Sequence, residues 1–124
     1  MSSNERARAQ QAYERVSARA ALGGKAWRQY RSIALKLPVM VHNEGLLPAL
    51  HFVAARGDAN QKLILDDLAL ALEQENQASM LCWMRSLEGD ALRNGTLEVQ
   101  RRLGWYKRLV QAFGKEPVDP GVVP

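Results

Sequence analysis

Apolar residues recur along this sequence at intervals of three and four, in segments that glycine and proline separate. This spacing places apolar side chains on one face of an α-helix. No run of four to eight residues shows the alternation of β-branched or aromatic residues that is typical of a strand. The sequence therefore predicts an all-α protein, a single compact bundle of about six to seven helices with long first and last helices.

Glycine, proline and capping residues set the expected helix ends. Pro38 restricts the backbone of Leu37 and is expected to break or kink a helix there. Asn60 is the expected cap of a later helix, and Thr96 is expected to open the last helix after the turn-rich stretch DALRNG. The expected helices are a first one from Ser2 or Ser3 to Gly23-Gly24, and others at about 26–37, 38–44, 46–55, 60–74, 79–88 and 96–113.

The length and composition fit one domain. A chain of 124 residues with 47% hydrophobic and 24% charged residues can build one core. Residues 1–113 are the expected helical domain, and residues 114–124, which hold three of the five prolines, are the expected flexible tail. No apolar stretch is long enough for a membrane span and the N-terminus lacks the apolar segment of a signal peptide, so we expect a cytoplasmic protein with no membrane partner.

Residue types that carry catalysis or bind metals do not form a recognisable pattern. The single cysteine, Cys82, excludes an intramolecular disulfide and is expected to be a small core residue. His42 and His51 lack further ligands at metal-binding spacing, so packing or surface positions are favoured over metal ligation. Glycine-rich phosphate loops and nucleophile elbows do not occur. The sequence predicts no enzyme, no cofactor and no metal.

Basic residues are concentrated at the two ends of the chain. Residues 1–36 contain eight basic and two acidic residues, residues 37–90 contain three and eight, and residues 91–124 contain six and three. A basic surface attracts polyanions such as nucleic acid. The acidic middle could meet the basic end of another copy.

The candidate nucleic-acid contacts come from three of the predicted helices. Aromatic residues are interleaved with the cations of the second and last helices, a combination that can hold phosphates and stack bases. Trp27 either stacks or belongs to the core, and Trp105 is either a stacking or interface anchor or part of a second packed face. The candidate cations are Arg8, Arg15, Arg19, Lys25, Arg28, Arg31, Lys36, Arg101 and Arg108.

The acidic residues of the middle segment are expected to form a solvated or partner-facing surface. Neighbours one or two positions apart point to different sides of a helix, so these carboxylates do not converge on a magnesium ion. The candidate partner interface consists of Asp66, Asp67, Glu73, Glu75 and Trp105.

The stretch YRSIALKLPVMVHNEGLLPALHFVAARG, residues 30–57, resembles a signature of the small, all-helical subunit of type III-B CRISPR RNA-guided effector complexes, the Cmr complexes. Residues 7–16 and 104–113 are also similar to the ends of that family. The chain differs from the family pattern in the insertion of Glu44 between Asn43 and Gly45, and in Pro48. The similar positions are Tyr30, Leu37-Pro38, Met40-Val41, Gly45-Leu46, Ala49-Leu50 and Phe52.

The resemblance implies a non-catalytic structural role in antiviral defence. Subunits of this kind stack in several copies along a filament of backbone subunits, and their basic surfaces line the groove that holds the guide RNA and its target RNA. The implied partners are therefore other Cmr subunits, especially backbone subunits, neighbouring copies of this chain, and the two RNAs.

Two further functions stay open from the residues themselves. A helix-turn-helix DNA-binding regulator is also small, helical and basic, although the central helices that would serve it carry the acidic excess. A helical protein-interaction adaptor without nucleic-acid contact would instead meet its partner through the acidic middle and Trp83 or Trp105.

Overall fold

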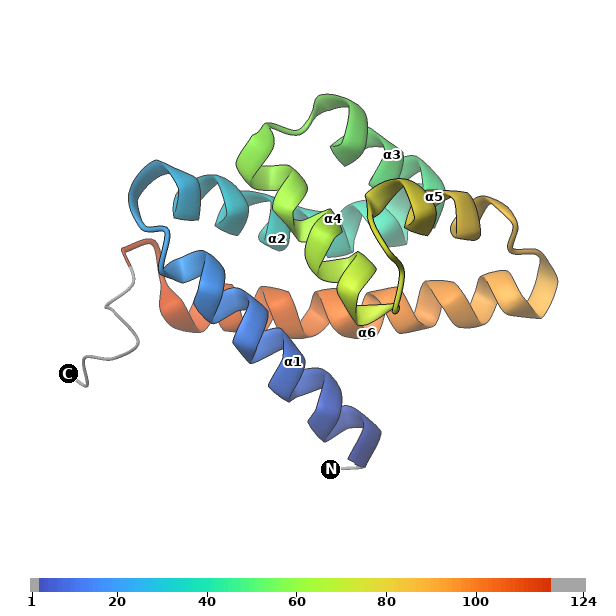
Figure 1. Cartoon of the computed structure of the whole chain (residues 1–124), viewed down its shortest axis with the longest axis horizontal. Coiled ribbons are helices and arrows are strands. Elements are labelled where there is room, and N and C mark those ends of the chain that lie inside the picture. The colour runs from blue at the N-terminus through green and yellow to red at the C-terminus, as the bar shows by residue number, and fades with distance from the viewer. Residues whose placement is uncertain (1–2, 117–124) are drawn as a thin grey trace.

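The computed structural model describes residues 3–116, which form six α-helices and no strand (Figure 1). The prediction of an all-α fold is confirmed. The predicted long first and last helices are α1, with 18 residues, and α6, with 25, and α2, with 21, is long as well. The helices are α1 (Ser3–Ala20), α2 (Gly24–Glu44), α3 (Leu46–Arg56), α4 (Ala59–Ala71), α5 (Gln77–Arg85) and α6 (Gly89–Phe113).

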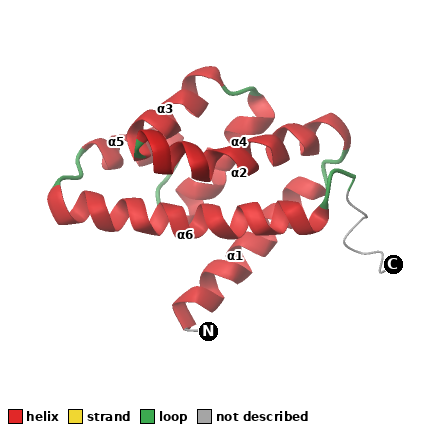
Figure 2. Ribbon diagram, turned by 180° about the vertical axis from the view of Figure 1, so that it is seen from behind, coloured by secondary structure: helices red, strands yellow, loops and turns green. Residues whose placement is uncertain are grey.

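The two longest helices, α2 and α6, pack against each other and organise the rest of the molecule. α1 crosses α6 obliquely, in front of it in Figure 1 and behind it in Figure 2. α4 packs mainly on α2, while α3 packs on α2 and α5. On α2 itself, Arg28, Lys36 and Val39 remain exposed.

One hydrophobic core collects buried residues from all six helices. Tyr30, Ala34 and Leu37, the positions of α2 that were predicted to face inward, are fully buried. Trp27 is fully buried as well, stacks on Tyr30 with ring centroids 6.1 Å apart, and donates from Nε1 to the carbonyl oxygen of Gly114 at 2.7 Å. Of the two interpretations of Trp27, the core position is the one that the structure supports.

Of the break or kink predicted at Pro38, the break is wrong, because α2 continues through Pro38 to Glu44, and the kink stays a prediction. Proline inside a helix costs about 3 kcal/mol. Leu37 and Val41 flank the proline and are buried, and burying an aliphatic side chain contributes about 1.5–3 kcal/mol. Burial of this segment of α2 thus outweighs the local cost, and the predicted third helix is the last part of α2.

Two other predicted helix starts are wrong. Asp58, not Asn60, caps α4, because its carboxylate accepts from the Gln61 amide and the Gln61 side chain accepts from the Asp58 amide in return. α6 begins at Gly89, seven residues before Thr96. The Thr96 hydroxyl donates to the Leu92 carbonyl at 2.8 Å and so stays within the helix.

Gly95 explains why the DALRNG stretch is helical rather than a turn. The residue is buried on α6, and a Cβ built at this position would lie 2.9 Å from the Leu87 Cδ1 atom. The absence of a side chain lets the connection after α5 pack directly on α6. Tertiary contact therefore compensates for the low helix propensity of Asn94 and Gly95.

The remaining predictions concern Cys82, membrane-spanning segments and the two ends of the chain. Cys82 is exposed, so its predicted core position is wrong. None of the helices described for residues 3–116 combines the length and the apolar character needed to cross a membrane. Of the predicted tail, residues 117–124 lie outside the described residues, as does the candidate cap Ser2. The domain boundary at residue 113 stays a prediction.

Candidate nucleic-acid interface

Three of the four arginines of α1 bind carboxylates of this chain, and a buried carboxylate from α4 holds two of them. Asp67 is fully buried, and its Oδ1 atom accepts from Arg15 Nε at 2.8 Å and from Arg19 Nη2 at 2.6 Å. The Tyr30 hydroxyl donates to Asp67 Oδ2 at 2.7 Å. A charge-assisted cluster thus joins α1, α4 and α2. We call Arg15, Arg19, Tyr30 and Asp67 the Asp67 cluster.

The pKa values of this cluster follow from burial and pairing. Burial raises the pKa of Tyr30 well above its ordinary value, and the Asp67 carboxylate beside it adds to the effect. Burial opposes the charged form of Arg19, but the hydrogen bond and charge of Asp67 outweigh it and raise the Arg19 pKa. The arginine therefore stays charged and bound to its carboxylate.

Arg8 is held in a second ion pair, on α6. Its Nη2 atom lies 2.8 Å from Glu98 Oε2, and Arg102 Nε lies 3.0 Å from Glu98 Oε1. These partners hold the pKa of Glu98 below its ordinary value, with the Arg8 hydrogen bond as the largest cause. The arginine stripe predicted on α1 is consequently paired along its length with carboxylates of this chain.

The cations of α2 have a different environment. A groove of about 330 Å³ runs along the outer side of α2 and is open to solvent. Lys115, which follows α6, contributes a fourth cation, which was not among the candidate cations predicted from the sequence. We call this the basic groove, and it is lined by Arg28, Arg31, Ser32, Leu35, Lys36 and Lys115.

Within residues 3–116, few carboxylates pair with the cations of the basic groove. Arg28 pairs with Glu116 at 3.1 Å, but both side chains are exposed, so solvent screens the pair. Arg31 donates from Nε to the Val110 carbonyl at 3.2 Å, which holds the guanidinium at the end of α6, and no carboxylate of the described residues forms an ion pair with it. Lys36 lies within 4.0 Å of no carboxylate among the residues that the structure describes.

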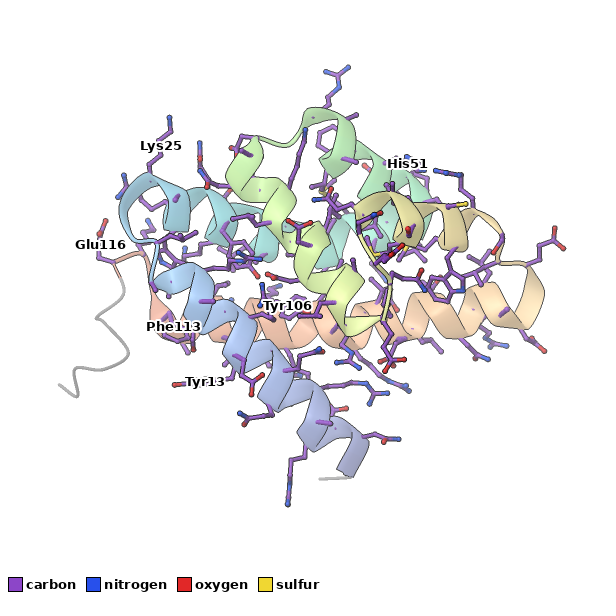
Figure 3. The ribbon with its side chains drawn as sticks, in the orientation of Figure 1. Tyr13, Lys25, His51, Tyr106, Phe113 and Glu116 are labelled. Carbon is purple, nitrogen blue, oxygen red and sulfur yellow. The ribbon has the colours of Figure 1, made fainter. Side chains whose placement is uncertain are left out.

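Lys25 belongs to the same end of the molecule but does not line the groove. Figure 3 shows Lys25 at the start of α2 and Glu116 just beyond α6, both at the end where the two helices meet. Lys25 is exposed. It can therefore extend the positive field of the basic groove beyond Arg28.

Arg101 and Arg108 occupy the outer face of α6, away from its buried stripe. The Arg108 guanidinium lies 5.1 Å from the centre of the Trp105 ring, a cation–π arrangement. Trp105 is half-buried and donates from Nε1 to a Glu5 carboxylate oxygen, so it joins α1 to α6. Trp105 packs against the core, as the packed-face interpretation predicts, and its role as a stacking or interface anchor stays a prediction.

The structure places the acidic residues of the candidate partner interface in two environments, one buried and one exposed. Asp67 cannot face a partner because it is fully buried in the Asp67 cluster, and that prediction is wrong. Asp66 is exposed and accepts from Gln77 Nε2 at 2.8 Å. Glu73 and Glu75 are also exposed, around the turn after α4. These three carboxylates form a small acidic surface around α4.

The histidines do not come together with other ligands. His51 Nε2 lies 3.4 Å from Arg85 Nη1, and His42 is exposed at the end of α2. Over residues 3–116, no group of three His, Cys, Asp or Glu side chains could hold a metal ion. The charged groups of the described surface gather in the basic groove and in the acidic surface of α4.

Comparison with known proteins relates this geometry to one family. The family described as CRISPR-associated protein (Cas_Cmr5) matches residues 4–113. The CRISPR system Cmr subunit Cmr5 of Thermus thermophilus is 39% identical over 108 residues, which cover 87% of this chain and 93% of that protein. A crystal structure of a CRISPR-associated Cmr5 family protein from Thermus thermophilus has a TM-score of 0.83 at 37% identity, covering 90% of this chain and 97% of the other.

Proposed function

Because this chain belongs to the Cmr5 family of CRISPR-associated proteins, we propose that it is a non-catalytic structural subunit that lines the RNA groove of a type III-B Cmr effector complex in several stacked copies. Membership of the family makes the chain a subunit of a Cmr complex. The lining of the guide and target RNA groove, the stacking of copies and the absence of catalysis are the proposed parts.

The basic groove is the observation that carries the RNA contact. Three cations of α2 and Lys115 surround one concave surface, and only one exposed carboxylate, Glu116, pairs with any of them in the described part of the chain. Phosphates that enter such a groove release condensed counterions, which drives binding without reading the sequence. These phosphate contacts alone would hold an RNA strand whatever its sequence.

The cations of α1 are not part of this proposal in the way that the sequence predicted. Arg8, Arg15 and Arg19 already bind carboxylates of this chain, and an RNA phosphate would have to displace them. Arg101 and Arg108 remain candidates for a second RNA contact beside Trp105, because they are exposed. The proposed primary contacts are Arg28, Arg31, Lys36 and Lys115, with Lys25 beside them.

The acidic surface of α4 suits contacts with other protein subunits. Asp66, Glu73 and Glu75 are exposed and would repel RNA, so they favour a protein partner with a basic surface. A neighbouring copy offers such a surface at its basic groove, and a backbone subunit is the other proposed partner. The chain itself thus has complementary charges for stacking.

Charge reversal in the basic groove tests the RNA contact. In a reconstituted Cmr complex, Lys36→Glu with Lys115→Glu should weaken retention of single-stranded target RNA by at least about tenfold. The slope of log affinity against log salt should become shallower by about 1.4, since each lost phosphate contact changes it by about 0.7. Retention is measured by filter binding over a series of salt concentrations.

The matched control carries the same change in charge elsewhere. Arg6→Glu with Arg56→Glu reverses two exposed cations on α1 and α3 that lie outside the basic groove, and it should leave retention within about twofold of the original. Equal losses in the two double variants would overturn the proposed groove. Preference for one duplex DNA sequence would support a helix-turn-helix regulator, and salt-insensitive assembly with no effect of either double variant would support an adaptor.

A further inference from the structure

A second hollow continues the basic groove along α2. It has a volume of about 380 Å³, within the range of sites that hold small molecules. The hollow and the basic groove share Leu35 and Lys36, so a ligand can occupy both at once. We call it the apolar hollow, and it is lined by Leu35, Lys36, Val39, Met40, Asn43 and Glu44.

The walls and the far end of the apolar hollow differ in chemistry. Leu35, Val39 and Met40 form its walls, and Val39 is 49% exposed although it is aliphatic. Asn43 and Glu44 close the end that lies away from Lys36. Within residues 3–116 neither of these two side chains has a hydrogen-bond partner, so their polar atoms are available to a ligand.

We propose that the apolar hollow accepts an unpaired nucleobase of the same RNA strand whose phosphates lie in the basic groove. This inference rests on the proposed function. A base has two apolar faces and a polar edge, which is the pattern that these walls and this end provide. The Met40 thioether can contact the π-face of the base, as methionine sulfur does with aromatic rings.

The spacing along α2 fits one nucleotide. Lys36 and Asn43 lie seven residues apart, which corresponds to about 10 Å along the helix axis. With its phosphate at Lys36, a nucleotide pointing along α2 brings its base between Val39 and Met40 and its edge to Asn43. The negative charge of Glu44 keeps phosphates away from this end and so sets the direction of the nucleotide.

The polar end predicts which bases are preferred. An asparagine amide can form a bidentate pair with N6 and N7 of adenine, and a glutamate carboxylate accepts from an exocyclic amino group such as N4 of cytosine. Uracil presents a carbonyl oxygen where these bases carry the amino group, and that oxygen would face Glu44. The expected order of preference is therefore adenine, then cytosine, then uracil.

An apolar side chain of a neighbouring protein subunit is the competing occupant. The nucleobase is favoured because the hollow shares a wall with a cationic groove and ends in two hydrogen-bonding side chains. A purely apolar side chain would make no use of the polar groups of Asn43 and Glu44, which are exposed at this end of the hollow.

Short oligonucleotides of equal length and charge test the inference with the full chain. Fluorescence anisotropy at low salt compares hexamers of adenylate, cytidylate and uridylate with a hexamer of abasic ribose phosphate. The adenylate hexamer should bind at least about fivefold more tightly than the abasic one, a difference that one base contact can supply. Asn43→Ala and Val39→Ser should each bring that ratio close to one while leaving the affinity for the abasic hexamer unchanged.

The control and the contradicting outcomes separate this inference from the proposed function. Leu70→Ser changes an aliphatic residue of matching exposure, 51%, on α4 and should leave the ratio unchanged. If all hexamers bind equally while Lys36→Glu with Lys115→Glu abolishes their binding, the base site is wrong and the basic groove stands. If that double variant has no effect on any hexamer, the groove fails as well. Loss of subunit assembly in Val39→Ser, with an unchanged base ratio, would assign the hollow to a protein side chain.

Discussion

The two helices at the N-terminal end of the chain carry similar sets of cations, yet the fold uses them in opposite ways. On α1 the arginines meet Asp67 from α4 and Glu98 from α6. On α2 the cations meet an open groove. The difference lies in the helices that face them rather than in the cations themselves. The spacing of basic residues on one helix therefore does not tell whether their charge is available.

The cations of α1 and of α2 also differ in how much they contribute to the stability of the fold. Asp67 is buried and accepts hydrogen bonds from three side chains, so its removal leaves the partner groups without compensation. Arg28 and Glu116 are exposed, and pairs of that kind contribute little to stability. The α1 cations thus stabilise the fold, whereas the α2 cations are proposed to act on a ligand.

The largest expected effect comes from removing the carboxylate that makes the two regions different. Asp67→Ala leaves two arginines and the Tyr30 hydroxyl unpaired, and it should lower the free energy of unfolding by about 3–5 kcal/mol. Urea denaturation followed by circular dichroism measures the change. Asp66→Ala is the matched control, because it removes the adjacent, exposed carboxylate and should change the free energy by less than about 0.5 kcal/mol. Equal effects of the two substitutions would contradict the structural role of the Asp67 cluster.

A smaller effect is expected from the second carboxylate that holds α1, and it depends on pH. The pKa of Glu98 lies below its ordinary value of 4.5 in the folded protein, so folding favours its ionised form. The resulting stabilisation is complete above the ordinary pKa and is lost as pH falls through the lower folded pKa. Glu98→Gln should therefore lower the free energy of unfolding by about 1 kcal/mol at neutral pH. The variant should also be less sensitive to acid between about pH 5 and about pH 3.

Urea denaturation at a series of pH values measures this dependence. Glu75→Gln removes an exposed carboxylate that has no ion pair within residues 3–116, and it serves as the control for loss of one negative charge. A Glu98→Gln variant whose acid sensitivity matches that of the unchanged protein would show that Arg8 and Arg102 are not held by Glu98 in solution.

The smallest expected effect concerns the exposed ion pair between α2 and the segment after α6. Glu116→Gln removes the carboxylate that pairs with Arg28 and a negative charge beside the basic groove. On the proposed function, RNA affinity should rise by about two- to threefold, while the free energy of unfolding changes by less than about 0.5 kcal/mol. Anisotropy titration and urea denaturation measure the two quantities. Unchanged affinity would mean that Arg28 does not contact phosphate.

The fold class could be predicted from the sequence because helical periodicity is a local property. Tyr30, Ala34 and Leu37 share a face by spacing, and that face is buried. The resemblance of residues 30–57 to the Cmr small subunits predicted the family that the whole-chain comparison shows. The errors occur where distant contacts decide local structure. Leu37 and Val41 keep α2 helical at Pro38, and the contact of Leu87 with Gly95 extends α6 toward its N-terminus.

The candidate site could be predicted only in part. The basic character of α2 is visible in the sequence, but the pairing of Arg15 and Arg19 with Asp67 joins residues about fifty positions apart, for which spacing gives no signal. Lys115 was missed because it follows the last helix in a segment that its prolines identify as a tail. The Trp27 hydrogen bond to Gly114 joins the residue before Lys115 to α2.

The Asp67 cluster also limits which substitutions this sequence can accumulate during evolution. Asp67 accepts from the other three side chains, so its replacement alone leaves two guanidinium groups and a hydroxyl without their partner, and a tolerated change has to come with changes in those partners. The lysines of α2 are not part of such a cluster, so each can be substituted, or its charge moved to another position, independently of the others. Selection should therefore conserve the arginines of α1 more strictly than the cations that are proposed to contact RNA. Sequence conservation alone would then point to the wrong helix as the RNA-binding one.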